Sequence, residues 1–146
     1  MFEKYTDKAR RTIFFARYEV SKLGGQLISP EHLLLGLLRE DDSVLPRLLG
    51  EQDKPVREAI RQRVVERCRV GEEISTSVEI PLADEMKDLL KYAGEESEGM
   101  GQGQIGTEHL LLGLLRVEGS LAAGVLGEQG VEYGAVREAL KEMAGE

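Results

Sequence analysis

The chain is poor in the residue types that build covalent cross-links and metal centres. Among its 146 residues are one cysteine, Cys68, and two histidines, His32 and His109. A single cysteine cannot form an internal disulfide, which agrees with a protein of the reducing cytoplasm. The chain is nevertheless long enough to bury a core without disulfides or metals. We therefore expect neither a metal ion nor a cofactor.

Long apolar runs are also absent. No stretch approaches the roughly 20 apolar residues that a membrane-spanning helix needs. Residues 1–11 are rich in charge and lack the apolar segment of a secretory signal. The sequence thus predicts a cytoplasmic protein without a membrane partner.

Positive charge is scarce as well. The chain has 19 Lys and Arg residues against 27 Asp and Glu residues, for a net charge of −8. No basic cluster is dense enough to follow a phosphate backbone, so nucleic acid is not an expected partner. Most acidic pairs, such as Glu95-Glu96, are expected to be solvated surface. The composition is otherwise that of a globular protein, and we expect a monomer.

What the chain does contain is one string of nine residues, present twice. Glu-His-Leu-Leu-Leu-Gly-Leu-Leu-Arg occupies residues 31–39 and recurs at residues 108–116, a shift of 109 − 32 = 77 between the histidines. An identical match of this length within one short chain is not plausible by chance. The sequence therefore consists of two copies of one structural unit.

Four helices are predicted in the first copy from apolar periodicity and end signals. Thr6 and Ser29 are placed to cap the first two helices, and Gly36 inside the second predicts close approach of a neighbouring backbone. The predicted helices cover residues 7–23, 30–39, 44–49 and 53–70.

The second copy preserves the apolar positions of the first. Under the 77-residue shift, Ala9, Ile13, Ala16 and Leu23 correspond to Met86, Leu90, Ala93 and Met100. The last helix needs a shift of 136 − 56 = 80, which indicates a three-residue insertion in the preceding loop. We predict an all-α fold of two four-helix repeats related by a pseudo-two-fold axis. Repeat 1 covers residues 1–70, a linker covers 71–81, repeat 2 covers 82–146, and together they form one compact domain.

The histidines do not form a recognisable catalytic or metal motif. Each follows a glutamate directly, and neighbouring residues on a helix point about 100° apart, whereas a helical zinc motif needs two histidines one turn apart. Packing or capping is the favoured role for His32 and His109, and a small core residue is the favoured role for Cys68 on the inner face of the fourth helix. No enzyme is expected, although a small hydrolase or metal protein using both histidines remains an alternative.

Glu31 and Glu108 are the more informative acidic residues. Each stands in the first turn of its helix, where a carboxylate stabilises the helix by interacting with its dipole. The alternative is a pair of symmetry-related pockets in which each carboxylate receives a guanidinium or an amine. The sequence leaves both interpretations open.

The duplicated string, preceded by Ile105-Gly106-Thr107 in the second copy, closely resembles the Clp N-terminal repeat of ClpC- and ClpA-type AAA+ unfoldases. The opening residues Met-Phe-Glu-Lys-Tyr-Thr-Asp-Lys-Ala-Arg do so too, and the resemblance covers essentially the whole chain. It implies a non-catalytic domain that docks adaptor proteins and unfolded or tagged substrates for a Clp ATPase ring, in cis or in trans. Because the chain carries no ATPase motif, it is expected to be either an excised domain or a free-standing Clp-repeat protein that modulates a Clp complex. Purely structural association through a helix face is a third possibility.

The resemblance also implies particular site residues. In ClpC-type domains the glutamate of each Gly-Thr-Glu-His motif lies in a pocket for phosphorylated arginine, which carries over to Glu31 and Glu108. Thr107 stands beside the second, and Pro30 takes the place of threonine beside the first. An apolar groove is implied near two further positions, Phe2 and Leu82.

The two implied pockets differ in sequence. Ser29-Pro30 replaces Gly-Thr in the first copy, and Asp84-Glu85 stand where the family is usually more basic. Carboxylates there would repel a phosphoryl group. Phosphoarginine binding is therefore better supported at Glu108 than at Glu31.

Overall fold

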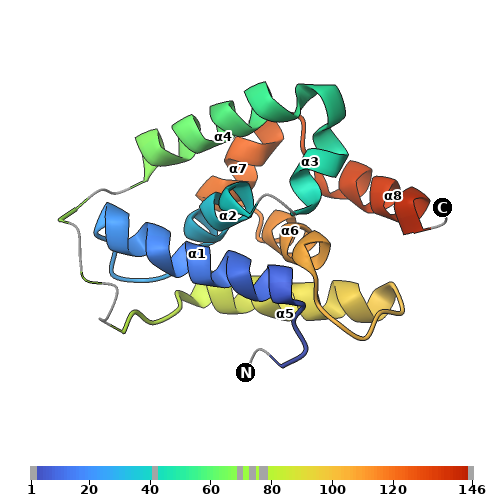
Figure 1. The fold of residues 1–146 in the computed structure, drawn as a ribbon, viewed down its shortest axis with the longest axis horizontal. Helices are drawn as coiled ribbons and strands as arrows, with labels where there is room; N and C mark the ends of the chain where they lie inside the picture. The colour runs from blue at the N-terminus through green and yellow to red at the C-terminus, as the bar shows by residue number, and fades with distance from the viewer. Residues whose placement is uncertain (1–2, 41–42, 69–70, 73–74, 76–78, 145–146) are drawn as a thin grey trace.

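The computed structural model describes residues 3–40, 43–68, 71–72, 75 and 79–144. Within these residues the chain forms eight α-helices and one short 3-10 helix, with no β-strand, so the predicted all-α fold is confirmed (Figure 1). The elements are α1 (Asp7–Leu23), α2 (Pro30–Arg39), α3 (Val44–Leu49), η1 (Gly50–Gln52), α4 (Asp53–Arg67), α5 (Asp84–Gly99), α6 (Thr107–Arg116), α7 (Leu121–Glu128) and α8 (Tyr133–Ala144).

The helix starts follow the internal repeat. α5 begins 84 − 7 = 77 residues after α1, the same shift relates α6 to α2 and α7 to α3, and α8 begins 133 − 53 = 80 residues after α4. The double repeat and its insertion before the last helix are therefore present in the fold. α4 ends at Arg67, and residues 69–70 of the predicted helix lie outside the described residues. The exact boundaries of the repeats and linker stay a prediction.

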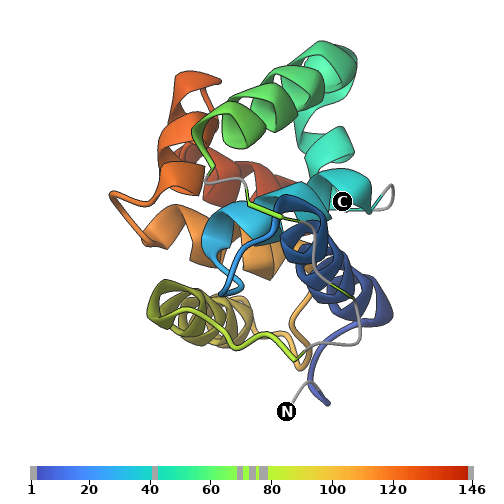
Figure 2. The same ribbon diagram turned by 90° about the vertical axis from the view of Figure 1, so that its left-hand side faces the viewer.

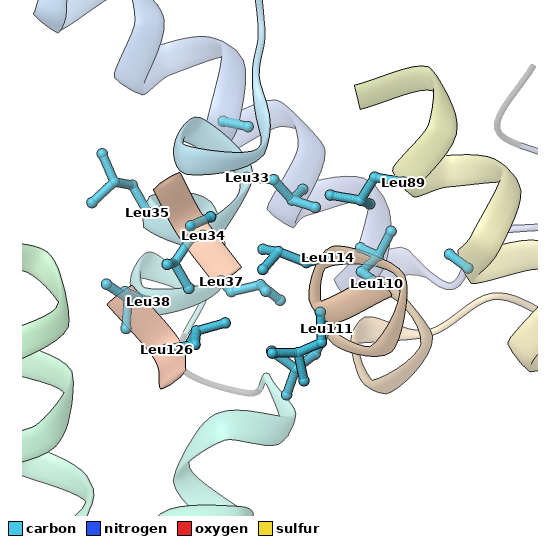
Figure 3. Packing of buried hydrophobic residues seen from close by; sticks show 14 of the residues in the cluster. Leu33, Leu34, Leu35, Leu37, Leu38, Leu89, Leu110, Leu111, Leu114 and Leu126 are labelled. Carbon is cyan, nitrogen blue, oxygen red and sulfur yellow. The ribbon is translucent and has the colours of Figure 1, made fainter. Parts of the chain in front are cut away.

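The two leucine strings form the centre of the molecule. Figures 1 and 2 show α2 and α6 between α1 and α5 on one side and α4 and α7 on the other. Leu33 and Leu37 of α2 are fully buried and lie on the side that faces Leu114 of α6 (Figure 3). The side chains of both repeats thus belong to one core, whose burial supplies most of the folding free energy.

Glycine inside each leucine string permits two helices to touch. A Cβ atom at Gly113 of α6 would lie 2.5 Å from the carbonyl oxygen of Leu89 and 3.0 Å from the backbone nitrogen of Ala93, both in α5. A Cβ atom at Gly36 of α2 would meet the backbone of α1 in the same way, 3.0 Å from the nitrogen of Ala16. The predicted close approach of a neighbouring backbone is confirmed in both copies.

Short stretches of backbone hydrogen bonding join the two repeats. The segment before α1 pairs with the loop before α6, where the Thr6 N–H donates to the Ile105 carbonyl oxygen at 2.9 Å. In the equivalent exchange, the Ala83 N–H donates to the Ile28 carbonyl oxygen, also at 2.9 Å. As a result, the start of α1 in the first repeat lies beside the start of α6 in the second.

A buried glutamate joins three helices within the second repeat. Glu96 of α5 is 6% exposed and lies 3.1 Å from Arg116 of α6 and 3.4 Å from Arg137 of α8, and its carboxylate accepts a hydrogen bond from the Tyr133 hydroxyl at 2.9 Å. The expectation of a solvated surface pair is therefore wrong for Glu96. It is buried because three donors satisfy its carboxylate.

The first repeat repeats this arrangement around Glu19. The Glu19 carboxylate in α1 lies 3.0 Å from Arg39 of α2 and 3.1 Å from Arg61 of α4. These ionic clusters hold α2 in the first repeat and α6 in the second repeat in position, because a buried carboxylate needs its cationic partners close by.

No single helix in the described part of the chain is long and apolar enough to cross a membrane. Only the pair Thr107–Arg116 and Leu121–Glu128, bent by 101°, meets the requirements of length and composition together. Most of the side chains in α6 are buried in the core described above.

Candidate functional site

A polar cavity of 530 Å³ opens beside Glu108. Its walls come from three places that are distant in sequence: the first turn of α1, the beginning of α3, and the residues that lead into α6. Figure 1 shows how the dark blue end of α1 comes to lie next to α6. The backbone exchange between Thr6 and Ile105 holds these two segments together, so the cavity depends on both repeats.

The cavity presents charges of both signs. Its lining includes three cationic side chains, Lys8, Arg10 and Arg47, and two acidic ones, Asp7 and Glu108. The N-terminal ends of α1 and α6 add positive partial charge. A ligand that carries an anionic group together with a cationic or strongly donating group matches this arrangement.

Glycine before α6 shapes the position of the Glu108 carboxylate. This carboxylate folds back over Gly106 so closely that a Cβ atom at residue 106 would overlap it, with the Glu108 Cδ at 2.9 Å. The side chain remains 32% exposed and therefore reachable from the cavity. In the first copy Ser29 takes the place of Gly106 and brings a Cβ atom, so Glu31 cannot lie in the same way.

Thr107 connects the site to the other repeat. Its buried hydroxyl oxygen accepts a hydrogen bond from the Val44 N–H at 3.1 Å, which fixes the start of α3 against α6. Thr107 also lines the cavity, and a hydroxyl group that accepts one hydrogen bond can still donate another. Pro30, at the equivalent position of the first copy, is buried and has no hydroxyl group to offer.

Glu31 lies in a different environment. It lines a separate cavity of 590 Å³ together with Ser29, Arg67 and Cys68. Burial raises the pKa of the Glu31 carboxyl, hydrogen bonds from its own backbone and from the Ser29 side chain lower it, and the nearby charge of Glu85 raises it further. The charge of Glu85 thus opposes a second negative charge at this position, whereas three cations surround the cavity at Glu108.

Of the two residues that mark the predicted apolar groove, the structure describes Leu82. Leu82 pairs through its backbone with Ile28, is partly buried against the core, and lines neither the cavity beside Glu108 nor the cavity beside Glu31. Phe2 lies outside the described residues. The groove therefore stays a prediction.

Both histidines cap the helices that they begin. The Nδ1 atom of His32 accepts a hydrogen bond from the Ser29 N–H at 3.0 Å, and the Nδ1 atom of His109 accepts one from the Gly106 N–H at 2.9 Å. These contacts satisfy backbone donors that a helix start leaves unpaired. The packing or capping role favoured from the sequence is confirmed, because both side chains are buried and both cap a helix. Among the described residues, no group of three or more His, Cys, Asp or Glu side chains is placed to hold a metal ion.

Cys68 has a histidine neighbour that the sequence did not reveal. It follows the last residue of α4 and is half-buried, so its placement within that helix was wrong. Its Sγ atom lies 4.0 Å from the Nε2 atom of His32. Burial and the charge of Glu31 raise the pKa of the Cys68 thiol, so the thiol stays protonated at neutral pH. This opposes a nucleophilic role, because the thiolate is the reactive form.

The His32 cap predicts a pH-dependent stability. Burial lowers the pKa of His32 from 6.5 to about 4. Because this pKa is depressed in the folded protein, protons favour the unfolded chain, and the free energy of unfolding should decrease as the pH falls from 6.5 toward 4. The expected loss is about 2 kcal/mol between pH 7 and pH 5, measurable by urea unfolding. The control is His32→Gln, whose amide oxygen can keep the cap but cannot titrate. An equal loss in this variant would contradict the assignment.

Comparison with known proteins identifies the fold family. A family model described as the Clp repeat (R) N-terminal domain matches residues 4–102 and 81–146. The chain belongs to this Clp repeat family. The Clp repeat is also the unit that the duplicated leucine string predicted.

Relatives of this Clp repeat chain are much longer proteins. It is 34% identical over 147 aligned residues to an ATP-dependent Clp protease ATP-binding subunit ClpA homolog of Porphyra purpurea, covering 100% of this chain and 18% of the relative. It is 35% identical over 147 residues to the chloroplastic chaperone protein ClpC1 of Arabidopsis thaliana, covering 100% of this chain and 16% of that protein. The chain thus spans less than a fifth of the length of these relatives.

Solved Clp-type domains have the same fold. The N-terminal domain of the caseinolytic protease associated chaperone ClpD from Arabidopsis thaliana is 28% identical, with a TM-score of 0.74 and coverage of 97% of both chains. The Hsp104 N-terminal domain from Candida albicans, at 21% identity, has a TM-score of 0.73 over 98% of this chain and 93% of its own. At that identity the second likeness concerns the fold alone.

Proposed function

We propose that this Clp repeat chain is a non-catalytic domain that docks adaptor or substrate proteins for a Clp AAA+ unfoldase. Family membership supports this role, and the relatives include proteins named as ATP-binding subunits of a Clp protease and as chaperones. Both histidines accept a backbone hydrogen bond as helix caps, which supports a structural role for them. The docked protein is delivered to an ATPase ring on the same chain or on another one.

Phosphorylated arginine is the proposed recognition mark, bound in the cavity at Glu108. The carboxylate of Glu108 suits the guanidinium part of this group, since carboxylates bind guanidinium through charge-assisted hydrogen bonds. Lys8, Arg10 and Arg47 and two helix N-termini suit its phosphoryl part. A volume of 530 Å³ lies within the usual range for a small-ligand site.

The observation that carries this proposal is the position of the Glu108 carboxylate in a cavity with three cations, one of which, Arg10, is paired with Asp7. Glu108 folds over Gly106 at the wall of this cavity, whose lining contains Lys8 and Arg47 in addition to the Arg10–Asp7 pair. Glu31 has a raised pKa and an acidic neighbour, so the second repeat is the proposed binding repeat.

Isothermal titration calorimetry with free phosphoarginine tests the proposal. We expect wild-type protein to bind it and Glu108→Ala to bind at least about tenfold more weakly, because a charge-assisted contact is lost. Glu31→Ala is the matched control and should keep the wild-type affinity. Equal binding by wild type and Glu108→Ala, or no binding by wild type, would sink the proposal.

A further inference from the structure

A second cavity, of 410 Å³, lies on the other side of Glu108. It shares Val44, Arg47 and Glu108 with the polar cavity, so the two hollows meet along one common wall. A polypeptide that places one residue in the first cavity therefore passes directly by the second. Neither the sequence motifs nor the family likeness pointed to this feature.

The second cavity differs from the first in its chemistry. Its apolar walls come from Met100 after α5 and from Leu140 and Met143 of α8. Leu140 is buried, and both methionines are partly buried against the core. Methionine side chains are flexible and polarisable, so they adapt to apolar groups of different shape. This surface gains free energy when an apolar side chain displaces water from it.

Cationic groups surround the apolar walls. Arg47, Arg137 and Lys141 line the cavity, while Glu108 is the single acidic residue among its lining residues. Arg137 is 3.4 Å from Glu96, and Lys141 is 3.6 Å from Glu138, so part of this charge is already balanced. Arg47, in the wall shared with the first cavity, makes no ion pair within the described residues, and its charge favours an acidic residue in a bound segment.

The first repeat preserves two of these three apolar positions, with Leu23 and Ile60 as the counterparts of Met100 and Leu140. The counterpart of Met143, 80 residues earlier, is the basic residue Arg63. The cavity beside Glu31 has apolar lining residues of its own, Leu27 and Leu121. A methionine-lined hollow thus accompanies Glu108, whereas the lining of the cavity beside Glu31 contains no methionine.

We infer that the second cavity binds a large apolar side chain adjacent to phosphoarginine in an acidic segment of the docked protein. The inference rests on the proposed function, because it assigns a specificity pocket to the same site. Glu108 and Arg47 divide the two pockets, so one extended segment fills both at once. The apolar side chain adds affinity and selects among marked proteins.

Fluorescence anisotropy with two labelled acidic peptides tests the inference on the wild-type chain. In one peptide phosphoarginine is flanked on both sides by leucine, and in the other it is flanked on both sides by serine. Free phosphoarginine is the unlabelled competitor. Burial of one leucine side chain predicts about tenfold tighter binding of the leucine peptide. Equal affinity for the two peptides, with free phosphoarginine bound, overturns the inference and leaves the proposed function intact. Failure of free phosphoarginine to bind overturns both.

Variants of the methionines locate the pocket. Met143→Asp should reduce the preference for leucine to less than about twofold, while the affinity for free phosphoarginine stays unchanged. Met100→Ser is a second, milder change at the opposite wall and should act in the same direction. Leu27→Asp alters a residue that is 44% exposed beside the other glutamate, and it should leave the preference intact. A preference that survives both methionine changes would overturn the inference.

Discussion

Replacing Glu96 with alanine is expected to lower the free energy of unfolding by about 3 kcal/mol. The change removes the acceptor of Arg116, Arg137 and the Tyr133 hydroxyl and leaves an empty space in its place. The carboxylate is 6% exposed and joins α5 to both α6 and α8. Removing one partner of a buried ionic cluster leaves the other charges buried without compensation, which lowers the stability strongly. Replacing the whole cluster with apolar side chains has a much smaller effect on stability. Urea unfolding followed by circular dichroism measures the loss.

Glu95 provides the matched control for this change. It precedes Glu96 directly and also contacts Arg116, at 2.9 Å, but its side chain is 46% exposed. Surface ion pairs contribute about 0–1 kcal/mol, so Glu95→Ala should lower the stability by less than about 1 kcal/mol. Similar losses for the two variants would show that burial of Glu96 does not matter to the fold.

Replacing Gly113 with valine is expected to lower the free energy of unfolding by about 3 kcal/mol, the upper end of the usual cost of overpacking. Any side chain at residue 113 meets the backbone of α5, at the Leu89 carbonyl oxygen and the Ala93 nitrogen. Backbone atoms cannot rotate away as a side chain can, so α5 and α6 must separate. The leucine core between the repeats then loses contacts.

Gly124 in α7 separates this effect from helix propensity. No atom lies within 4 Å of a Cβ placed there, and its backbone is not left-handed. Gly124→Val should therefore change the stability by less than about 1 kcal/mol. If Gly113→Val were as mild, then α5 and α6 would not be held in contact at this glycine.

Much of the fold followed from local signals. The Thr6 and Ser29 helix starts, the glycine after α1 and the shift of 77 residues gave helix positions close to those observed. The end of α4 was less predictable, because periodicity alone continues past Arg67. Gly36 indicated a close helix contact, since a glycine inside a buried helix needs a compensating reason.

The apolar periodicity of the sequence could not predict contacts between segments that are distant along the chain. The exchange of Tyr5 with Ile105 joins two repeats that the sequence describes separately. The burial of Glu96 was missed because a glutamate in an acidic chain is usually solvated, and its three donors come from two other helices. The approach of Cys68 to His32 likewise has no local sequence signal.

The candidate site was predictable only in part. Resemblance to the Clp repeat singled out Glu108 and Thr107, and the structure places both at one cavity. It did not indicate Lys8 or Arg47, which arrive from the first repeat through tertiary packing. The replacement of Gly-Thr by Ser29-Pro30 did predict that the two glutamates differ, and their surroundings are indeed unlike. Phosphoarginine binding and a cytoplasmic location stay predictions.

The number of phosphoarginine molecules bound per chain tests the functional proposal most directly. A calorimetric titration should give one site in the wild-type chain, still one site in Glu31→Ala, and only weak binding in Glu108→Ala. Charge and hydrogen-bond donors gather at Glu108, whereas Glu85 opposes an anion near Glu31. Two equivalent sites, or a site that is lost in Glu31→Ala and kept in Glu108→Ala, would contradict the proposal.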